Sequence, residues 1–280
     1  MPTLLEGKII ASGIKEEIKR QINSLGFAPT LVSIAVGENH GVSSYVKSQM
    51  KVSNELGVNF KLESLPEDTT QECLVGLINK LNREKSVNGI IVDFPLPKGI
   101  NCGRISSCIS PDKDVEGMHP ENLGSLLLRR PKFIPCTAAA ALELIKSSGV
   151  QLRGKEAVVI GHSEIIGKPL ALMLMDEFAT VTVCHIATSE ANKLKEHVEK
   201  AEVLIVAVGK AGLIKGDWIK KDSVVIDVGI NRLGDKIVGD VEFEAASRKA
   251  SYITPVPGGV GPLTVVMLMR NLVNACKLQL

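Results

Sequence analysis

The residues with the clearest chemical potential form a glycine-containing turn between an apolar run and a helix-forming run. Residues 157–160 (AVVI) are followed by residues 161–167 (GHSEIIG) and then by KPLALMLM. A turn that joins a strand to the start of a helix directs backbone N–H groups and the positive end of the helix dipole at one point, where a pyrophosphate can bind. The spacing departs from GxGxxG, and such a turn also serves simple packing. The turn alone therefore leaves dinucleotide binding and packing equally open.

The strand expected next, residues 181–185 (VTVCH), ends without the groups that usually select a dinucleotide. No Asp or Glu follows it to bind the ribose of NAD, and no Arg follows it to bind the 2′-phosphate of NADP. His162 and His185 could supply partial positive charge or could be ordinary polar loop residues. Asp227 and Asn231 frame another strand end, where Asp227 could serve a cofactor or cap a turn. The choice between NAD and NADP stays open.

Helical and extended patterns alternate along the chain, which is typical of an α/β fold with a largely parallel sheet. Extended segments in the first half are expected at 31–36, 59–65 and 89–94, with helices at 9–25, 44–56 and after the Asp68, Thr69, Thr70 cluster. A second alternation begins with a helix at 138–146 and continues with strands at 157–160, 181–185, 203–208 and 223–228. We predict an α/β domain over 1–135, onto which a last helix of about 263–280 packs, and a Rossmann-type domain over 136–262.

Composition narrows the class of partner. The 280 residues are 45% hydrophobic and 23% charged with a formal net charge of +2, so no strong field steers the chain to nucleic acid or to an anionic membrane. The uncharged stretch 250–269 is interrupted by prolines and glycines and is not expected to span a bilayer. The six cysteines show no CxxC pair, and no His cluster has metal-ligand spacing. We expect a cytoplasmic protein with reduced thiols, a small-molecule substrate and no metal.

Longer motifs resemble the methylenetetrahydrofolate dehydrogenase/methenyltetrahydrofolate cyclohydrolase family over nearly the whole chain. They are PDKDVEGMHPENLG (111–124), FIPCT (133–137), GHSEIIGKP (161–169), VIDVGIN (225–231) with GD (239–240), and ITPVPGGVGPLT (253–264). The resemblance implies an N-terminal α/β folate-binding domain and a C-terminal Rossmann-type dinucleotide-binding domain, in a homodimer. It also implies hydride transfer from 5,10-methylenetetrahydrofolate, held in a cleft, to NAD(P)⁺.

The resemblance also implies roles for individual residues. The dinucleotide contacts would be Gly161, His162, Ser163, Ile186 and Ile230. The family commonly has Arg at position 162 and Ser at position 186, and both departures remove partners of a 2′-phosphate. Positions that close over folate and nicotinamide would be Pro257 and Gly258.

The helix predicted over 44–56 resembles a family segment that carries a Tyr and, four residues later, a catalytic Lys. Tyr45 is present, but position 49 is Gln. Tyr45 and Gln49 lie on one inward-facing stripe of the helix. Lys47 and Lys51 point roughly 160° away from Gln49, at about 100° per residue, and so do not easily replace the missing ammonium.

Two further polar positions differ from the family pattern: Asp93 stands for a Gln, and Glu116 stands for an Asp in KDVEG. Loss of hydride produces a delocalised cation and requires positioning and electrostatics. Addition of water to that cation requires proton transfer, for which a Lys of lowered pKa is suited and a Gln is not. We take Tyr45, Gln49, Asp93 and Glu116 as the catalytic candidates and predict a dehydrogenase with weak or absent cyclohydrolase activity.

Other interpretations remain open at this level. The three changes could reflect drift, or Asp93 or Glu116 could have become the base of a fully bifunctional enzyme. A decayed, non-catalytic folate or dinucleotide binder is a further alternative, which the intact PGGVGP and VIDVGIN strings disfavour. An ordinary Rossmann dehydrogenase for a small hydroxy acid ranks last, because no motif places a catalytic His or Lys in the second domain.

Overall fold

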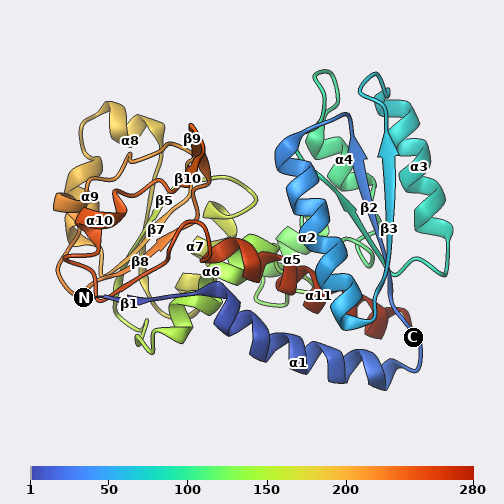
Figure 1. The fold of residues 1–280 in the computed structure, drawn as a ribbon, viewed down its shortest axis with the longest axis horizontal. Helices are drawn as coiled ribbons and strands as arrows, with labels where there is room; N and C mark the ends of the chain where they lie inside the picture. Colours follow the sequence, from blue (N-terminus) through green and yellow to red (C-terminus); the bar gives the residue numbers. More distant parts are fainter. Residues whose placement is uncertain (1) are drawn as a thin grey trace. The chain divides into compact units, whose positions relative to one another are not determined.

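The computed structural model describes residues 2–280, apart from the side chain of His40. The chain divides into two compact units, each with its own parallel sheet (Figure 1). The three-stranded unit comprises residues 13–136 and 265–280, and the six-stranded unit comprises residues 1–12 and 137–264.

The sheet of the three-stranded unit has the order β3-β2-β4. Its strands are β2 (Thr30–Val36), β3 (Asn59–Leu65) and β4 (Gly89–Val92). Its helices are most of α1 (Gly7–Leu25), α2 (His40–Leu56), α3 (Gln71–Arg83), α4 (Cys102–Cys108), α5 (Pro120–Leu127) and most of α11 (Val260–Gln279).

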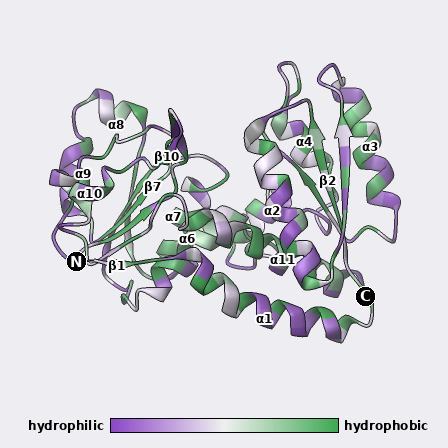
Figure 2. Ribbon diagram, in the orientation of Figure 1, coloured by the Kyte–Doolittle hydropathy of each residue, from purple (hydrophilic) through white to green (hydrophobic). Residues whose placement is uncertain are grey.

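Strand β2 is buried along its whole length, because helices cover both faces of the sheet. Val32 and Ile34 pack with residues of α3 and α4, whereas Ala35 packs with Val42 and Val46 of α2. Ser33 lies between Val32 and Ile34, so its side chain faces the same side as Ala35, toward α2. Figure 2 shows β2 as mostly hydrophobic and α1 as mixed.

Local signals fix the ends of α2. The Asn39 side chain accepts hydrogen bonds from the backbone N–H groups of Gly41 and Val42, which caps the first turn. Gly57 ends the helix in the left-handed conformation with φ of 76°. These two caps set the position of the intervening helix, including Tyr45 and Gln49.

The sheet of the six-stranded unit has the order β1-β11-β8-β7-β5-β6, and every pairing is parallel. Its strands are β1 (Thr3–Leu4), β5 (Glu156–Ile160), β6 (Thr180–Cys184), β7 (Val203–Val206), β8 (Val224–Asp227) and β11 (Tyr252–Ile253). The remaining elements are α6 (Cys136–Ser147), α7 (Gly167–Asp176), α8 (Ile186–Glu190), α9 (Leu194–Lys200), the 3₁₀ helix η1 (Gly216–Trp218), the hairpin of β9 (Asn231–Leu233) and β10 (Lys236–Val238), and α10 (Phe243–Ala246).

The predicted α/β fold with two domains and largely parallel sheets is confirmed. Contacts place the first twelve residues with the six-stranded unit, although the predicted domain over 1–135 includes them. These residues belong to the six-stranded unit because β1 pairs with β11 through backbone hydrogen bonds. The short sequence of β1 does not predict this pairing.

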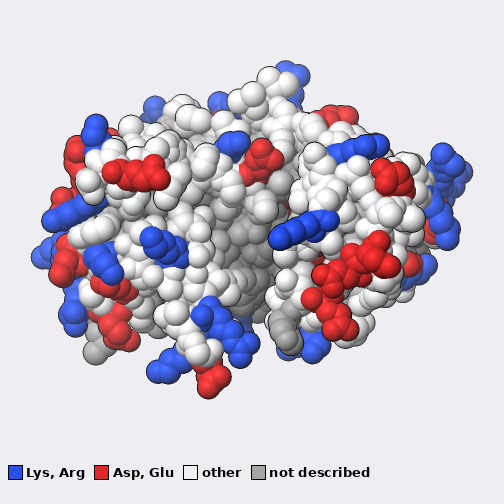
Figure 3. Space-filling view, turned by 90° about the horizontal axis from the view of Figure 1, so that it is seen from above, with Lys and Arg blue, Asp and Glu red and all other residues white. Residues whose placement is uncertain are grey.

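Within the described residues, no helix is long and apolar enough to cross a bilayer. Positive and negative side chains are interspersed over the face drawn in Figure 3. This mixture agrees with the small net charge of +2.

Candidate active site and dinucleotide-binding loop

Asp93 lies directly after β4, at the carboxyl edge of the three-stranded sheet. Its Oδ2 accepts a hydrogen bond of 2.6 Å from the Ser33 hydroxyl, and its Oδ1 accepts one of 2.9 Å from the Gln49 amide. Asp93 is 3% exposed, and Ser33 and Gln49 are fully buried. Burial raises the pKa of the Asp93 carboxyl, while the hydrogen bonds from Ser33 and Gln49 lower it in part.

Two buried polar atoms beside this triad have no hydrogen-bond partner, the carbonyl oxygen Oε1 of Gln49 and the hydroxyl of Tyr45. Because the Gln49 amide nitrogen donates to Asp93, its carbonyl oxygen is left as an acceptor. Burial and repulsion by Glu116 and Asp93 raise the pKa of Tyr45 well above its ordinary value, so its hydroxyl stays a neutral donor. An unpaired donor and an unpaired acceptor at one site indicate a bound molecule with the opposite groups.

Glu116 is held in a tight turn. The Asp114 carboxylate accepts backbone hydrogen bonds from Gly117 at 3.1 Å and His119 at 2.7 Å, and a third from the Asn122 amide at 2.8 Å. Gly117 has φ of 75°, and a Cβ there would lie 2.8 Å from the Ile134 carbonyl carbon, so the turn requires glycine. Desolvation and then repulsion by Asp93 and Asp114 raise the pKa of Glu116 to about 8.

The structure thus brings Tyr45, Gln49, Asp93 and Glu116 to one part of the three-stranded unit. Hydrogen bonding joins Gln49 to Asp93, and charge repulsion couples Glu116 to Asp93 and Tyr45. With Glu116 protonated below a pH of about 8, the cluster presents neutral donors and acceptors beside the Asp93 carboxyl.

Cys136 packs beside this cluster. Its thiol contacts the carbonyl oxygen of Val115 at 3.4 Å, and burial raises its pKa well above the ordinary value. The Asn271 amide of α11 donates to the carbonyl oxygens of Val115 at 2.8 Å and Ile134 at 2.9 Å. These contacts favour a packing role for Cys136, because a thiol that does not ionise is a poor nucleophile.

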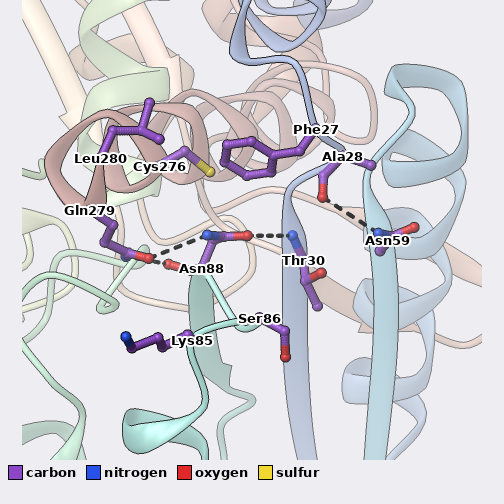
Figure 4. Close-up of a pocket in the computed structure, with 10 residues that line it drawn as sticks. All are labelled: Phe27, Ala28, Thr30, Asn59, Lys85, Ser86, Asn88, Cys276, Gln279 and Leu280. Carbon is purple, nitrogen blue, oxygen red and sulfur yellow. Dashed lines mark hydrogen bonds between the residues drawn. The ribbon is translucent and has the colours of Figure 1, made fainter.

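A cavity of about 430 Å³ lies elsewhere in the three-stranded unit (Figure 4). Thr30, Asn59 and Asn88 place it at the amino edge of the sheet, whereas Asp93 lies at the carboxyl edge. Its polar groups serve structure: Asn88 accepts from the Thr30 N–H at 2.9 Å, and Gln279 donates to the Asn88 carbonyl oxygen at 2.9 Å. This cavity is therefore separate from the candidate active site.

In the six-stranded unit, the predicted dinucleotide loop joins β5 to α7. Gly161 has φ of 116°, and a Cβ there would overlap the Ala207 carbonyl oxygen. A Cβ at Gly167 would overlap the Gly161 carbonyl oxygen, so both glycines are needed for this turn. No side chain caps the first turn of α7, and the Ser163 hydroxyl accepts from the Ile166 N–H at 3.3 Å. The loop and the helix start are suited to a pyrophosphate.

The other predicted dinucleotide contacts lie beyond strand ends of this sheet. His162 and His185 follow the paired strands β5 and β6, and their ring centroids are 5.3 Å apart. Ile186 is 69% exposed and Ile230 is 70% exposed. Gly258 accepts a hydrogen bond of 2.9 Å from the Gly7 N–H, which ties the turn after Pro257 to the start of α1.

Asp227 and Asp240 organise the loops beside these residues. Asp227 is 4% exposed and accepts from the backbone N–H groups of Gly229, Asp240 and Val241. Burial raises its pKa to about 6. Of the two roles considered for Asp227, the structure supports the structural one, because its oxygens receive backbone donors.

Three residues that build these sites were given no role from the sequence: Ser33, Asn271 and Asp240, although Asp240 lies in the GD motif at 239–240. Asp240 accepts from the N–H groups of residues 208, 209 and 210 and from the Asn231 amide. A signal was present for Ser33, because it is the single polar residue in the run LVSIAV. No comparable local signal marks Asn271, whose partners lie more than 130 residues earlier.

Comparison with known proteins agrees with this arrangement. Residues 5–116 match the tetrahydrofolate dehydrogenase/cyclohydrolase catalytic domain, and residues 135–280 match the NAD(P)-binding domain of the same family. The bifunctional protein FolD of Acetivibrio thermocellus is 49% identical over 280 residues, which cover 99% of this chain and 97% of that protein.

Two solved structures extend the similarity to the fold. The bifunctional FolD methylenetetrahydrofolate dehydrogenase/cyclohydrolase of Campylobacter jejuni has a TM-score of 0.95 and 45% identity, with all of both chains covered. The Trypanosoma brucei dehydrogenase-cyclohydrolase, solved with NADP and an inhibitor, has a TM-score of 0.95 and 37% identity, with 99% of this chain and 97% of that chain covered. The chain therefore belongs to the tetrahydrofolate dehydrogenase/cyclohydrolase family.

Proposed function

We propose that this chain oxidises 5,10-methylenetetrahydrofolate to 5,10-methenyltetrahydrofolate and lacks efficient cyclohydrolase activity. The observation that carries the proposal is the buried amide of Gln49, which donates to Asp93 and leaves its own carbonyl oxygen without a partner. This is the position at which the family resemblance implies a lysine. Family membership supports the dehydrogenase step.

The chemistry of the hydride step suits these side chains. The carbon that loses hydride lies between two nitrogens and becomes part of a delocalised cation. Gln49 Oε1 and the Asp93 carboxyl place electron-rich oxygens in the site, and such fixed dipoles stabilise developing positive charge. The unpaired Tyr45 hydroxyl is a donor that can orient the folate. No side chain needs to take a proton in this step.

The dinucleotide would be held by Gly161, Ser163 and the first turn of α7, where the glycines permit close backbone approach and no side chain occupies the helix start. When bound, NAD(P)⁺ supplies the hydride acceptor. The turn at Pro257 and Gly258 and the exposed Ile230 are proposed as further contacts of folate and cofactor.

Water addition makes a different demand. The attacking water must lose a proton, and a Lys of lowered pKa can accept it whereas the Gln49 amide cannot. The Asp93 carboxyl also disfavours a hydroxide-like transition state beside it, because like charges repel. Both effects act against the cyclohydrolase step and not against hydride loss.

A second candidate is a fully bifunctional enzyme in which Glu116 is the base. The observation that favours it is the pKa of Glu116 at about 8, close to the value that suits a general base at neutral pH. Glu116→Gln would then abolish water addition and spare hydride transfer. If Asp93 were the base, Asp93→Asn would have that effect.

The test measures both reactions on one purified sample. We expect NAD(P)H formation with methylenetetrahydrofolate, and conversion of methenyl- to 10-formyltetrahydrofolate at the spontaneous rate. Enzyme-dependent conversion well above that rate would overturn the proposal, and the Glu116→Gln and Asp93→Asn variants would then identify the base. Binding of folate and dinucleotide without any NAD(P)H formation would indicate a non-catalytic binder.

We also propose that the chain acts as a homodimer through the edge of the six-stranded sheet. Strand β6 is the last in the strand order, and Met175, Phe178 and Val183 around it are 50%, 58% and 37% exposed. Unpaired strand edges and exposed apolar residues are typical of interfaces. Sedimentation equilibrium should give twice the chain mass, and Val183→Lys should shift the protein toward the monomer.

A further inference from the structure

The place where a Rossmann-type domain recognises the adenosine ribose is the end of its second strand, which here is β6. Strands β5 and β6 pair in register, with Ile160 opposite Cys184, and the Gly161 N–H donates to the Cys184 carbonyl oxygen at 2.9 Å. The dinucleotide loop and the residues after β6 therefore emerge side by side at the carboxyl edge of this sheet.

The side chains at this point are poor partners for a phosphate dianion. His185, Ile186 and Ala187 follow β6 in succession and are exposed, and Ile186 has 69% of its surface in solvent. No Lys or Arg occurs in residues 185–190. Helix α8 has only five residues, and the Thr188 hydroxyl accepts from the His185 N–H at 3.2 Å, so its first turn adds no phosphate site.

The adjoining dinucleotide loop does not supply the missing positive charge. Lys168, the second residue of α7, lies 3.5 Å from Glu164, and both side chains are exposed. The His162 and His185 rings lie against one another at 5.3 Å and an interplanar angle of 54°. These two rings and the exposed Ile186 offer imidazole and hydrocarbon surface without a Lys or Arg side chain, which suits an adenine base and a neutral ribose.

We infer that the adenosine end of the site selects a dinucleotide with a free 2′-hydroxyl, NAD⁺ over NADP⁺, and that Ile186 is the selectivity-determining residue. A free 2′-hydroxyl can remain hydrated or hydrogen-bond to an imidazole at little cost. A 2′-phosphate would lose hydration against the hydrocarbon of Ile186 without gaining a cation. The inference deepens the proposed function by naming the cofactor, and it rests on the same dinucleotide loop.

The test uses cofactor fragments, so that it does not depend on folate chemistry. Isothermal titration of the full chain would compare ADP with its 2′-phosphorylated form. We expect ADP to bind at least about 10-fold more tightly, equivalent to about 1.4 kcal/mol. Equal binding, tighter binding of the 2′-phosphorylated ligand, or no binding of either would overturn the inference.

Two variants test the role assigned to Ile186. Ile186→Arg should shift the ratio of the two affinities toward the 2′-phosphorylated ligand by at least about 10-fold, because Arg supplies charge-assisted hydrogen bonds to the 2′-phosphate. Gln151→Arg adds the same charge at an exposed position before β5, on the amino side of the sheet, and should change neither affinity. An unchanged ratio in Ile186→Arg, or the same gain in Gln151→Arg, would contradict the assignment. Selective fragment binding without dehydrogenase activity would refute the proposed reaction and leave the selectivity intact.

Discussion

Replacing Glu116 by Gln should change how the stability of the protein depends on pH. Burial and neighbouring carboxyls hold the pKa of Glu116 at about 8, against an ordinary value of 4.5. The unfolded chain releases this proton above a pH of about 4.5, whereas the folded chain keeps it until about 8, so unfolding becomes more favourable as pH rises through this window. At about 1.4 kcal/mol per pH unit, the loss reaches at most about 5 kcal/mol.

Glu116→Gln removes the titrating group while keeping the shape of the side chain. Because Asp93 and Asp114 share the repulsion, we expect part of the full effect. The variant should gain about 2 to 4 kcal/mol of stability relative to wild type between pH 5 and pH 9. Urea unfolding at several pH values measures this difference, and hydrogen exchange of β2 amides assigns it to the three-stranded unit.

The control is Glu16→Gln, because Glu16 is exposed on α1 in the same unit. Its stability should follow the wild-type curve at every pH. An independent readout is the infrared carbonyl band of a protonated carboxyl, which should be present at pH 7 in wild type and missing in Glu116→Gln. Parallel stability curves for wild type and Glu116→Gln would refute the reasoning, because Glu116 would then ionise in the folded state as it does in the unfolded one.

Further predictions concern the active-site triad and the loops of the six-stranded unit. Gln49→Lys alone should not create cyclohydrolase activity, because Asp93 at hydrogen-bond distance would keep the new amine protonated. The double variant Gln49→Lys, Asp93→Gln should restore water addition. A single variant as active as the double variant would contradict this explanation. Asp240→Ala should destabilise the six-stranded unit by about 3 kcal/mol or more, because it removes the hydrogen-bond acceptor of the N–H groups of residues 208, 209 and 210. Hydrogen exchange of these three amides should accelerate, and unchanged protection would argue against the role of Asp240.

The sequence predicted the fold well where burial dominates. Residues 31–36 read as a strand buried on both faces, and β2 is buried throughout. Periodicity placed Gln49 on the inward stripe of its helix, and it is fully buried. The chain ends were harder: β1 has only two residues, and its pairing with β11 depends on a segment about 250 positions away.

The sequence predicted which residues form the candidate site but not how these residues interact with one another. Motifs and resemblance pointed to Gln49, Asp93 and Glu116, yet the hydrogen bond from Gln49 to Asp93 joins residues 44 positions apart. The pKa of Glu116 follows from desolvation by surrounding residues, which the string KDVEG does not encode. Long-range hydrogen bonds and burial therefore had to come from the structure.

Gln49 and Asp93 are proposed to support hydride transfer but not water addition. The most direct test of this proposal is the rate at which the purified protein converts methenyltetrahydrofolate to 10-formyltetrahydrofolate, measured on the sample that shows dehydrogenase activity. We expect no acceleration over the spontaneous reaction. Acceleration comparable with the dehydrogenase turnover would contradict the proposal.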